Sequence, residues 1–140
     1  LLEDWTESIH LQINQRFENS ASIQDGFLET SRSLKEIING SSNNLSLLFE
    51  FWQHSVKDPA LWRRAIRPLH QFKQHFLDLL NQGINSDEII VRDPELVANT
   101  ILAFSFGIIA SSMLDAQQDW GEVSSYGFSA LFTQMRGRDL

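Results

Sequence analysis

Residues 93–115 have the sequence DPELVANTILAFSFGIIASSMLD, and this stretch decides the fold. It begins with Asp and Pro, which start a helix because Asp caps the first turn and proline fits the first helical position. No charged residue lies between positions 96 and 114. On a helical wheel one face carries Val97, Ile101, Phe104 and Ile108, the opposed face carries Leu102, Phe106, Ile109 and Met113, and a strip of Ala103 and Gly107 lies between them. A helix that is apolar on two sides needs a cover on both.

The rest of the chain also predicts helices, and no strand pattern of useful length is present. Amphipathic patterns cover residues 1–19, 23–39, 45–57, 59–82 and 122–136. Gly40 and Gly83 predict helix ends, and Pro68 predicts a bend inside the fourth pattern. We therefore expect an all-α fold, a single helical domain of five to six helices over residues 1–140.

Composition excludes several classes of function. The 140 residues carry a net charge of −7, which argues against the chain itself gripping nucleic-acid phosphates. Without cysteine there is no disulfide or thiolate site, and a cytoplasmic location is expected. Residues 96–114 are long enough to span a bilayer, but they contain Asn99, Thr100 and Ser105 and have acidic flanks. We expect no membrane-spanning segment.

No pattern of catalytic or metal-binding residues is visible. His70 and His75 are five positions apart, a poor spacing for one helix face, and Glu7 with His10 matches only half of a di-iron carboxylate site. No Gly-rich phosphate loop and no nucleophile elbow occur. We therefore expect solvent-exposed histidines, no metal, no cofactor and no enzymatic activity.

Aromatic residues are more numerous on the predicted inner faces than close packing requires. They are Phe27, Phe49, Trp52, Phe72, Phe76, Phe104 and Phe106. Each of them is compatible with plain core packing, but as a group they are typical of the lining of an apolar ligand cavity. A helix bent at Pro68 beside them would help to hold such a cavity open.

The second half of the chain resembles the C-terminal half of TetR-family transcriptional regulators. In GINSDEIIVRDPELVANTILAFSFGI, residues 83–108, the family's order of signals falls on Gly83, Glu88, Asp93, Ala98 and Gly107. The preceding FEFWQHSVKDPALWRRAIRPLHQFKQHFLDLLNQG, residues 49–83, is similar to the family's stretch between two core helices. The family's N-terminal helix-turn-helix domain is not present in residues 1–19. A further departure is Phe106, where relatives often have an acidic residue, and it suggests a more apolar pocket wall.

The resemblance implies a homodimeric domain that binds a small apolar or aromatic effector, with DNA contacted only through the absent N-terminal domain. The last two long helices would form a four-helix-bundle dimer interface. The ligand-binding residues expected from the aromatic cluster and the resemblance are Phe27, Phe49, Trp52, Ala65, Pro68, Leu69, Phe72, Leu102, Phe106 and Ala110. The interface residues implied are Val97, Phe104, Gly107, Ile108, Phe128, Leu131 and Phe132, and Phe104→Asp is expected to break the dimer.

The sequence leaves two other hypotheses open. One is a helical protein–protein interaction module with a solid core and no small-molecule pocket. The other is a helical, metal-dependent enzyme, which has only scattered histidines in its favour. A cavity larger than a water molecule among the predicted helices distinguishes a ligand-binding domain from the interaction module.

Overall fold

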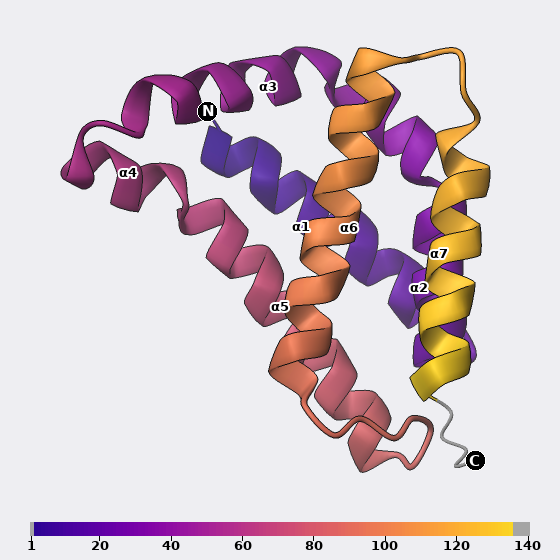
Figure 1. Cartoon of the computed structure of the whole chain (residues 1–140). Helices are drawn as coiled ribbons and strands as arrows, with labels where there is room; N and C mark the ends of the chain where they lie inside the picture. The colour runs from indigo at the N-terminus through magenta and orange to yellow at the C-terminus, as the bar shows by residue number, and fades with distance from the viewer. Residues whose placement is uncertain (1, 136–140) are drawn as a thin grey trace.

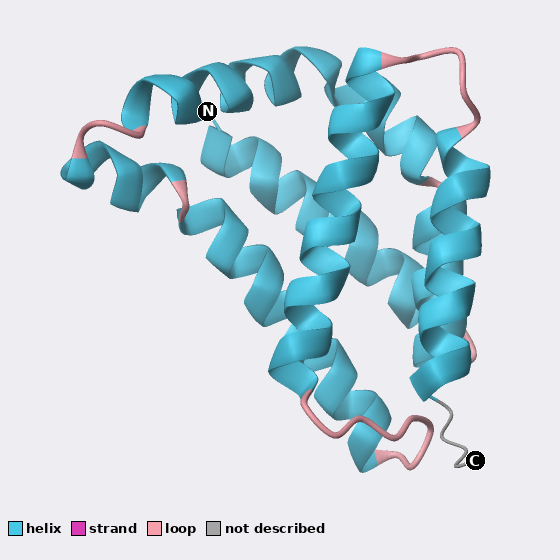
Figure 2. Ribbon diagram, viewed as in Figure 1, coloured by secondary structure: helices cyan, strands magenta, loops and turns pink. Residues whose placement is uncertain are grey.

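The computed structural model describes the backbone of residues 2–135 and their side chains, except those at positions 2, 3, 34, 35 and 37–43. This part of the chain contains seven helices and no strand (Figure 2). The helices are α1 (Leu2–Glu18), α2 (Ile23–Arg32), α3 (Leu34–Ser55), α4 (Pro59–Ala65), α5 (Arg67–Asn85), α6 (Pro94–Leu114) and α7 (Trp120–Met135) (Figure 1). The predicted all-α class is confirmed, and the count is six when α4 and α5 are taken as one bent helix.

The helices pack around a shared hydrophobic core. The helices α6 and α7 run antiparallel side by side, joined by a loop at the top of Figure 1. On the other side of α6 lies α5, which packs against it, and α2 packs against α7. The first helix, α1, crosses behind α6 and contacts α2, α3 and α5. The outline is triangular in this view, with α3, α4–α5 and α7 along its sides.

Phe27 of α2 lies at the centre of the hydrophobic core. It is 2% exposed, and its ring centroid lies 4.9 Å from that of Phe17, 6.0 Å from Phe76 and 5.0 Å from Phe132. These partners come from α1, α5 and α7. Burial of such large apolar side chains is the main favourable term in folding, so this aromatic cluster fixes the packing of the four helices.

The bend predicted at Pro68 is confirmed. Proline has no N–H, so in a continuous helix the carbonyl of Arg64 would have no i+4 hydrogen-bond donor. The helix α4 instead ends at Ala65. The indole Nε1 of Trp52 in α3 donates a hydrogen bond of 2.6 Å to the carbonyl of Ala65. The broken end of α4 is thereby tied to α3.

Two predicted helix ends are wrong. Gly40 lies inside α3, and the break after α2 falls at Ser33, whose N–H bonds to the carbonyl of Glu29 at 3.0 Å. A glycine inside a helix costs only about 1 kcal/mol relative to alanine, which packing readily outweighs. Gly83 lies inside α5, which continues to Asn85, and a Cβ there would lie 3.0 Å from the side chain of Ile89. Gly83 therefore permits close packing rather than ending the helix.

The last helix starts two residues earlier than predicted, at Trp120, and its predicted end at position 136 lies outside the described residues. The loop between α5 and α6 is attached to two other elements. Ile90 N–H donates to the carbonyl of Met135 at 2.9 Å, and the carboxylate of Glu88 accepts from the N–H groups of Ile23 and Gln24. Both contacts hold the start of α6 against the core.

Candidate ligand-binding site

A cavity of about 110 Å³ lies among the helices, and we call it the central cavity. Six helices, all except α4, contribute to its wall. The lining residues are Trp5, Ile9, Ile13, Phe27, Thr30, Ser31, Leu45, Leu48, Phe72, Phe76, Leu102, Ser105, Phe106, Ile109, Ser124 and Phe128. The wall is almost entirely carbon, and none of the described residues that line it is ionisable. A cavity of this kind suits a small apolar molecule.

Four of the ten residues predicted to bind a ligand line the central cavity. These are Phe27, Phe72, Leu102 and Phe106, and they come from α2, α5 and α6. These four residues therefore border an open space, and their role in binding a ligand stays a prediction.

The other six predicted residues are not part of the cavity lining. They are Phe49, Trp52, Ala65, Pro68, Leu69 and Ala110. Trp52 packs edge-on to Phe49 with ring centroids 5.5 Å apart and bonds to Ala65, which is 1% exposed. The contacts of Trp52 hold α3 against α4, whereas Leu69 packs against the hydrophobic core.

Sequence reasoning missed the contribution of the first helix. Trp5, Ile9 and Ile13 form the apolar stripe of α1, and all three line the cavity. The stripe was visible at a helical spacing of three and four, but periodicity shows only that a face is covered. It does not show whether the cover is a packed side chain or an open space.

The residues predicted for a dimer interface include both buried and partly buried side chains. Phe132 is 0% exposed, Ile108 is 4% exposed, and Phe128 is buried on the cavity wall. Val97, Phe104 and Leu131 are partly buried against the core. The Phe104 face of α6 packs in part on this chain's own α7, and its assignment to a partner stays a prediction. The ring of Phe104 contacts that of Phe128 edge-on at 5.2 Å, and a Cβ at Gly127 would overlap it.

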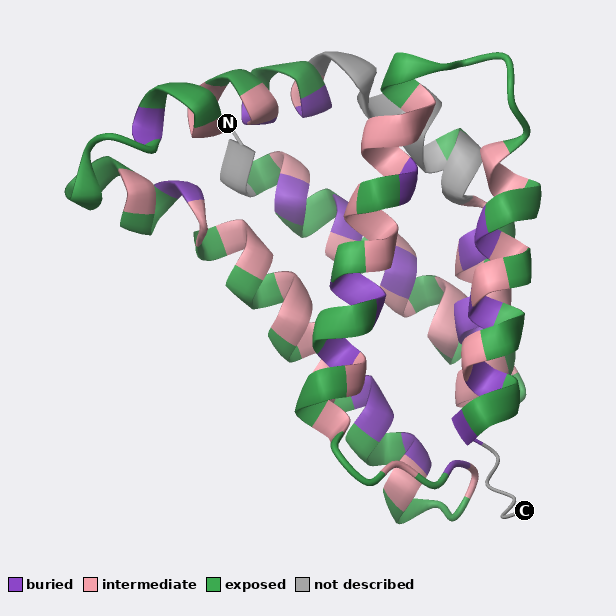
Figure 3. Cartoon of the chain, in the orientation of Figure 1, coloured by how far each residue is buried: buried purple, intermediate pink, exposed green. Residues whose placement is uncertain are grey.

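On the opposed face of α6, the ring centroid of Phe106 lies 5.3 Å from that of Trp52 in α3, whereas Met113 is 42% exposed. An exposed strip lies between the two faces (Figure 3). We call it the outer stripe of α6, and it consists of Leu96, Thr100, Ala103, Gly107 and Leu114, all exposed. No atom of the described residues lies within 4 Å of a Cβ built on Gly107. The small-residue strip is thus the part of this helix still open to a partner.

Two of the four histidines are half-buried, contrary to the sequence prediction. His10 of α1 and His75 of α5 stack with ring centroids 5.1 Å apart, and neither Nε2 has a hydrogen-bond partner within the described residues. Burial lowers the pKa of His10, and the charge of His75 lowers it further. Burial also lowers the pKa of His75, against an opposing effect of Asp78. His54 and His70 are exposed, as predicted.

The described residues contain no group of three or more His, Cys, Asp or Glu side chains that would hold a metal ion. Within the same residues, α6 is the one helix long and apolar enough to cross a membrane by length and composition, with a mean hydropathy of 1.7. Core helices of soluble proteins meet the same criterion, so the expected absence of a membrane span stays a prediction. Comparison of the chain with protein-family models, with curated proteins and with solved structures finds no match.

Proposed function

We propose that this chain is the ligand-sensing and homodimerisation domain of a TetR-like transcriptional repressor, and that the central cavity binds its small apolar effector. The observation that carries the proposal is the cavity itself. Its volume of about 110 Å³ exceeds the roughly 30 Å³ that one water molecule occupies in the liquid. An apolar space of this size is costly to leave empty, because its lining atoms lack partners for dispersion contacts. A bound apolar molecule restores those contacts.

The position of α6 supports coupling between the cavity and an assembly. Leu102, Ser105 and Ile109 of α6 line the cavity, while Ala103 and Gly107 of the same helix are exposed on the outer stripe. A ligand that fits one position of α6 better than another shifts the population of the two positions. In a homodimer held by α6, that shift changes the spacing of DNA-binding domains attached to the two chains.

A solid-core protein-interaction module is the second candidate, and the cavity counts against it. The exposed outer stripe of α6 is compatible with either function, because a foreign helix and a second copy both cover an apolar face. The cavity has no role in a module that binds proteins through its surface. Ligand binding in solution therefore separates the two candidates.

Filling the cavity tests the proposal. Ser105 lies on the cavity wall, so Ser105→Leu places a larger apolar side chain in the space. Toluene at about 100 times its dissociation constant should stabilise the unaltered protein by about 2.7 kcal/mol, and Ser105→Leu should abolish the effect. Calorimetric titration and thermal unfolding with toluene provide the measurement.

The matched control is Ser111→Leu, which makes the same change on the same helix away from the cavity lining. It should leave toluene binding intact. Ile109→Phe offers a second way of filling the cavity if Ser105→Leu does not fold. Toluene that binds all of these variants equally, or does not bind the unaltered protein, contradicts the proposal.

A further inference from the structure

Among the described residues that line the central cavity, Ser124 has a hydroxyl whose hydrogen bonding is incomplete. Ser124 of α7 is 0% exposed, lines the cavity, and its Oγ has no hydrogen-bond partner among the described residues. A buried hydroxyl without a partner costs about 1–3 kcal/mol. The cavity wall therefore has a polar point that a ligand group is able to satisfy.

The other buried serines have hydrogen-bonded hydroxyls, in contrast to Ser124. Ser31 Oγ donates to the carbonyl of Leu28 at 2.7 Å, and Ser55 Oγ donates to the carbonyl of Phe51 at 2.6 Å. Serine within a helix usually satisfies its hydroxyl in this way. Ser105, which also lines the cavity, donates to the carbonyl of Ile101 at 2.8 Å. Of the cavity serines Ser31, Ser105 and Ser124, Ser124 is the one whose hydroxyl makes no hydrogen bond to a described residue. Because Ser124 is 0% exposed, a ligand group reaches this hydroxyl through a small shift of the cavity wall.

The remaining wall restricts the charge of a ligand. Apart from Thr30 and the three serines, the cavity is lined by aliphatic and aromatic side chains, and none of the lining residues is ionisable. Moving a charged carboxylate or ammonium from water into such surroundings is strongly unfavourable without a paired charge. A neutral hydroxyl or carbonyl needs only one hydrogen-bond partner, and Ser124 provides it.

We infer that the central cavity selects an uncharged, largely apolar molecule with one hydroxyl or carbonyl group, which pairs with the Ser124 hydroxyl. This inference rests on the proposed function of the cavity and adds the chemical class of its ligand. The size follows from the volume: an engineered cavity of about 150 Å³ holds benzene, so this one takes a molecule of one small ring or a short chain.

Phenol and toluene test the inference because they have nearly the same shape and differ in one hydrogen-bonding group. The quantity to measure is the ratio of the toluene to the phenol dissociation constant, by calorimetric titration of the full chain. Ser124→Ala should lower this ratio about fivefold, as expected for the loss of one neutral hydrogen bond. The unfolding temperature of the ligand-free variant should not fall, because the substitution removes an unsatisfied hydroxyl.

Ser55→Ala is the matched control, since Ser55 is also fully buried but does not line the cavity. It should leave the ratio unchanged. If both ligands bind and the ratio is the same in Ser124→Ala, the role of Ser124 is wrong while the cavity still binds ligands. If neither ligand binds, the proposed function fails as well. Benzoate carries the same ring with a negative charge, and its binding in the cavity would overturn the requirement for a neutral ligand.

Discussion

Glu88 joins two distant parts of the chain through its carboxylate. Its oxygens accept hydrogen bonds from Ile23 N–H at 3.0 Å and Gln24 N–H at 2.9 Å, in the first turn of α2. Ser22 caps the same helix from within the chain by accepting from Asp25 N–H at 3.0 Å. A negative charge at a helix N-terminus is favourable, so Glu88 satisfies free donors and opposes the positive end of the helix dipole.

Removing this carboxylate should destabilise the protein. We expect Glu88→Ala to lower the free energy of unfolding by about 1–2 kcal/mol, because the two N–H groups lose a charged acceptor. Urea unfolding followed by circular dichroism measures the change. Glu50→Ala, at an exposed position of α3, serves as the control and should stay within about 0.5 kcal/mol. Equal stabilities of the two variants would refute the cap.

The stacked histidines predict a loss of stability in mild acid. The pKa values of His10 and His75 are lowered by burial from the usual 6.5, so the folded state resists protonation. The unfolded chain takes up protons first as the pH falls through about 6.5, and stability then decreases toward the folded pKa values. Above that pH the contribution is fully present.

Melting temperatures between pH 7.5 and 5.5 measure this effect. The double variant His10→Phe, His75→Phe should show a smaller decrease than the unaltered protein, because both groups that resist protonation are gone. The pair His54→Gln, His70→Gln changes exposed residues and should keep the full decrease. A pH dependence that persists unchanged without His10 and His75 would assign it to other groups.

At the scale of single residues, the sequence predicted hydrogen bonds whose donor and acceptor are close together in the chain. The cap at Asp93 was predicted, and its carboxylate accepts from Leu96 N–H at 3.1 Å. The cap from Glu88 was not predicted, because its partners lie 64 and 65 positions away. The free hydroxyl of Ser124 was also invisible, since it depends on the surroundings of one side chain.

At the scale of the element, α6 shows what a helical wheel can predict and what it cannot. The wheel correctly divided the helix into two large faces and a small-residue strip. It did not show that α7 covers the Phe104 face and α3 contacts the Phe106 face. Both contacts come from the same chain, so the exposed outer stripe is the surface that we assign to the proposed dimer.

A charge on the outer stripe should prevent dimerisation. Ala103→Asp places a carboxylate at an exposed, uncharged position where a second copy of α6 would approach closely. Light scattering coupled to size exclusion at micromolar concentration should give a dimer for the unaltered protein and a monomer for the variant. Phe104→Asp is a poor test, because that side chain packs on Phe128 within one chain.

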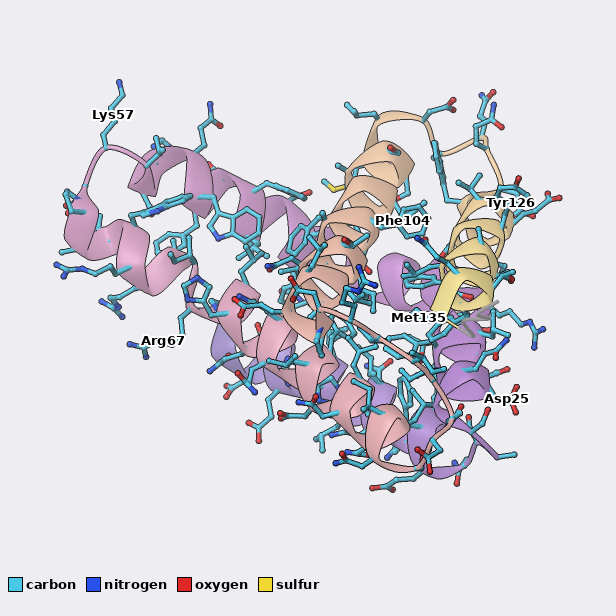
Figure 4. The ribbon with its side chains drawn as sticks, turned by 60° about the horizontal axis from the view of Figure 1, so that its bottom comes forward. Asp25, Lys57, Arg67, Phe104, Tyr126 and Met135 are labelled. Carbon is cyan, nitrogen blue, oxygen red and sulfur yellow. The ribbon has the colours of Figure 1, made fainter. Side chains whose placement is uncertain are left out.

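The control for this experiment is Ala60→Asp, an exposed alanine on α4 far from the stripe. It should remain dimeric. Tyr126 of α7 is 79% exposed and points away from the core (Figure 4), so Tyr126→Ser tests whether α7 also contributes. An unaltered protein that is monomeric at these concentrations contradicts the dimer.

For the whole molecule, the sequence predicted the class of fold but only part of the interior. Amphipathic periods and caps determine where helices form, and the predicted bend at Pro68 is present between α4 and α5. The central cavity depends on how six helices pack together, and no local pattern contains that information. For this reason the wall was predicted at Phe27 and Leu102 but missed at Ile9 and Ile13.

The account as a whole depends on the central cavity holding a small neutral molecule. A crystal structure of the protein soaked with iodobenzene tests this directly, because the anomalous signal of iodine locates the ligand. We predict a single strong iodine site inside the cavity, bordered by Phe27, Leu102 and Phe128. An occupied cavity in the Ser111→Leu protein and an empty one in Ser105→Leu would complete the result. Iodine found only on the outer surface, with the cavity closed by side chains, would contradict it.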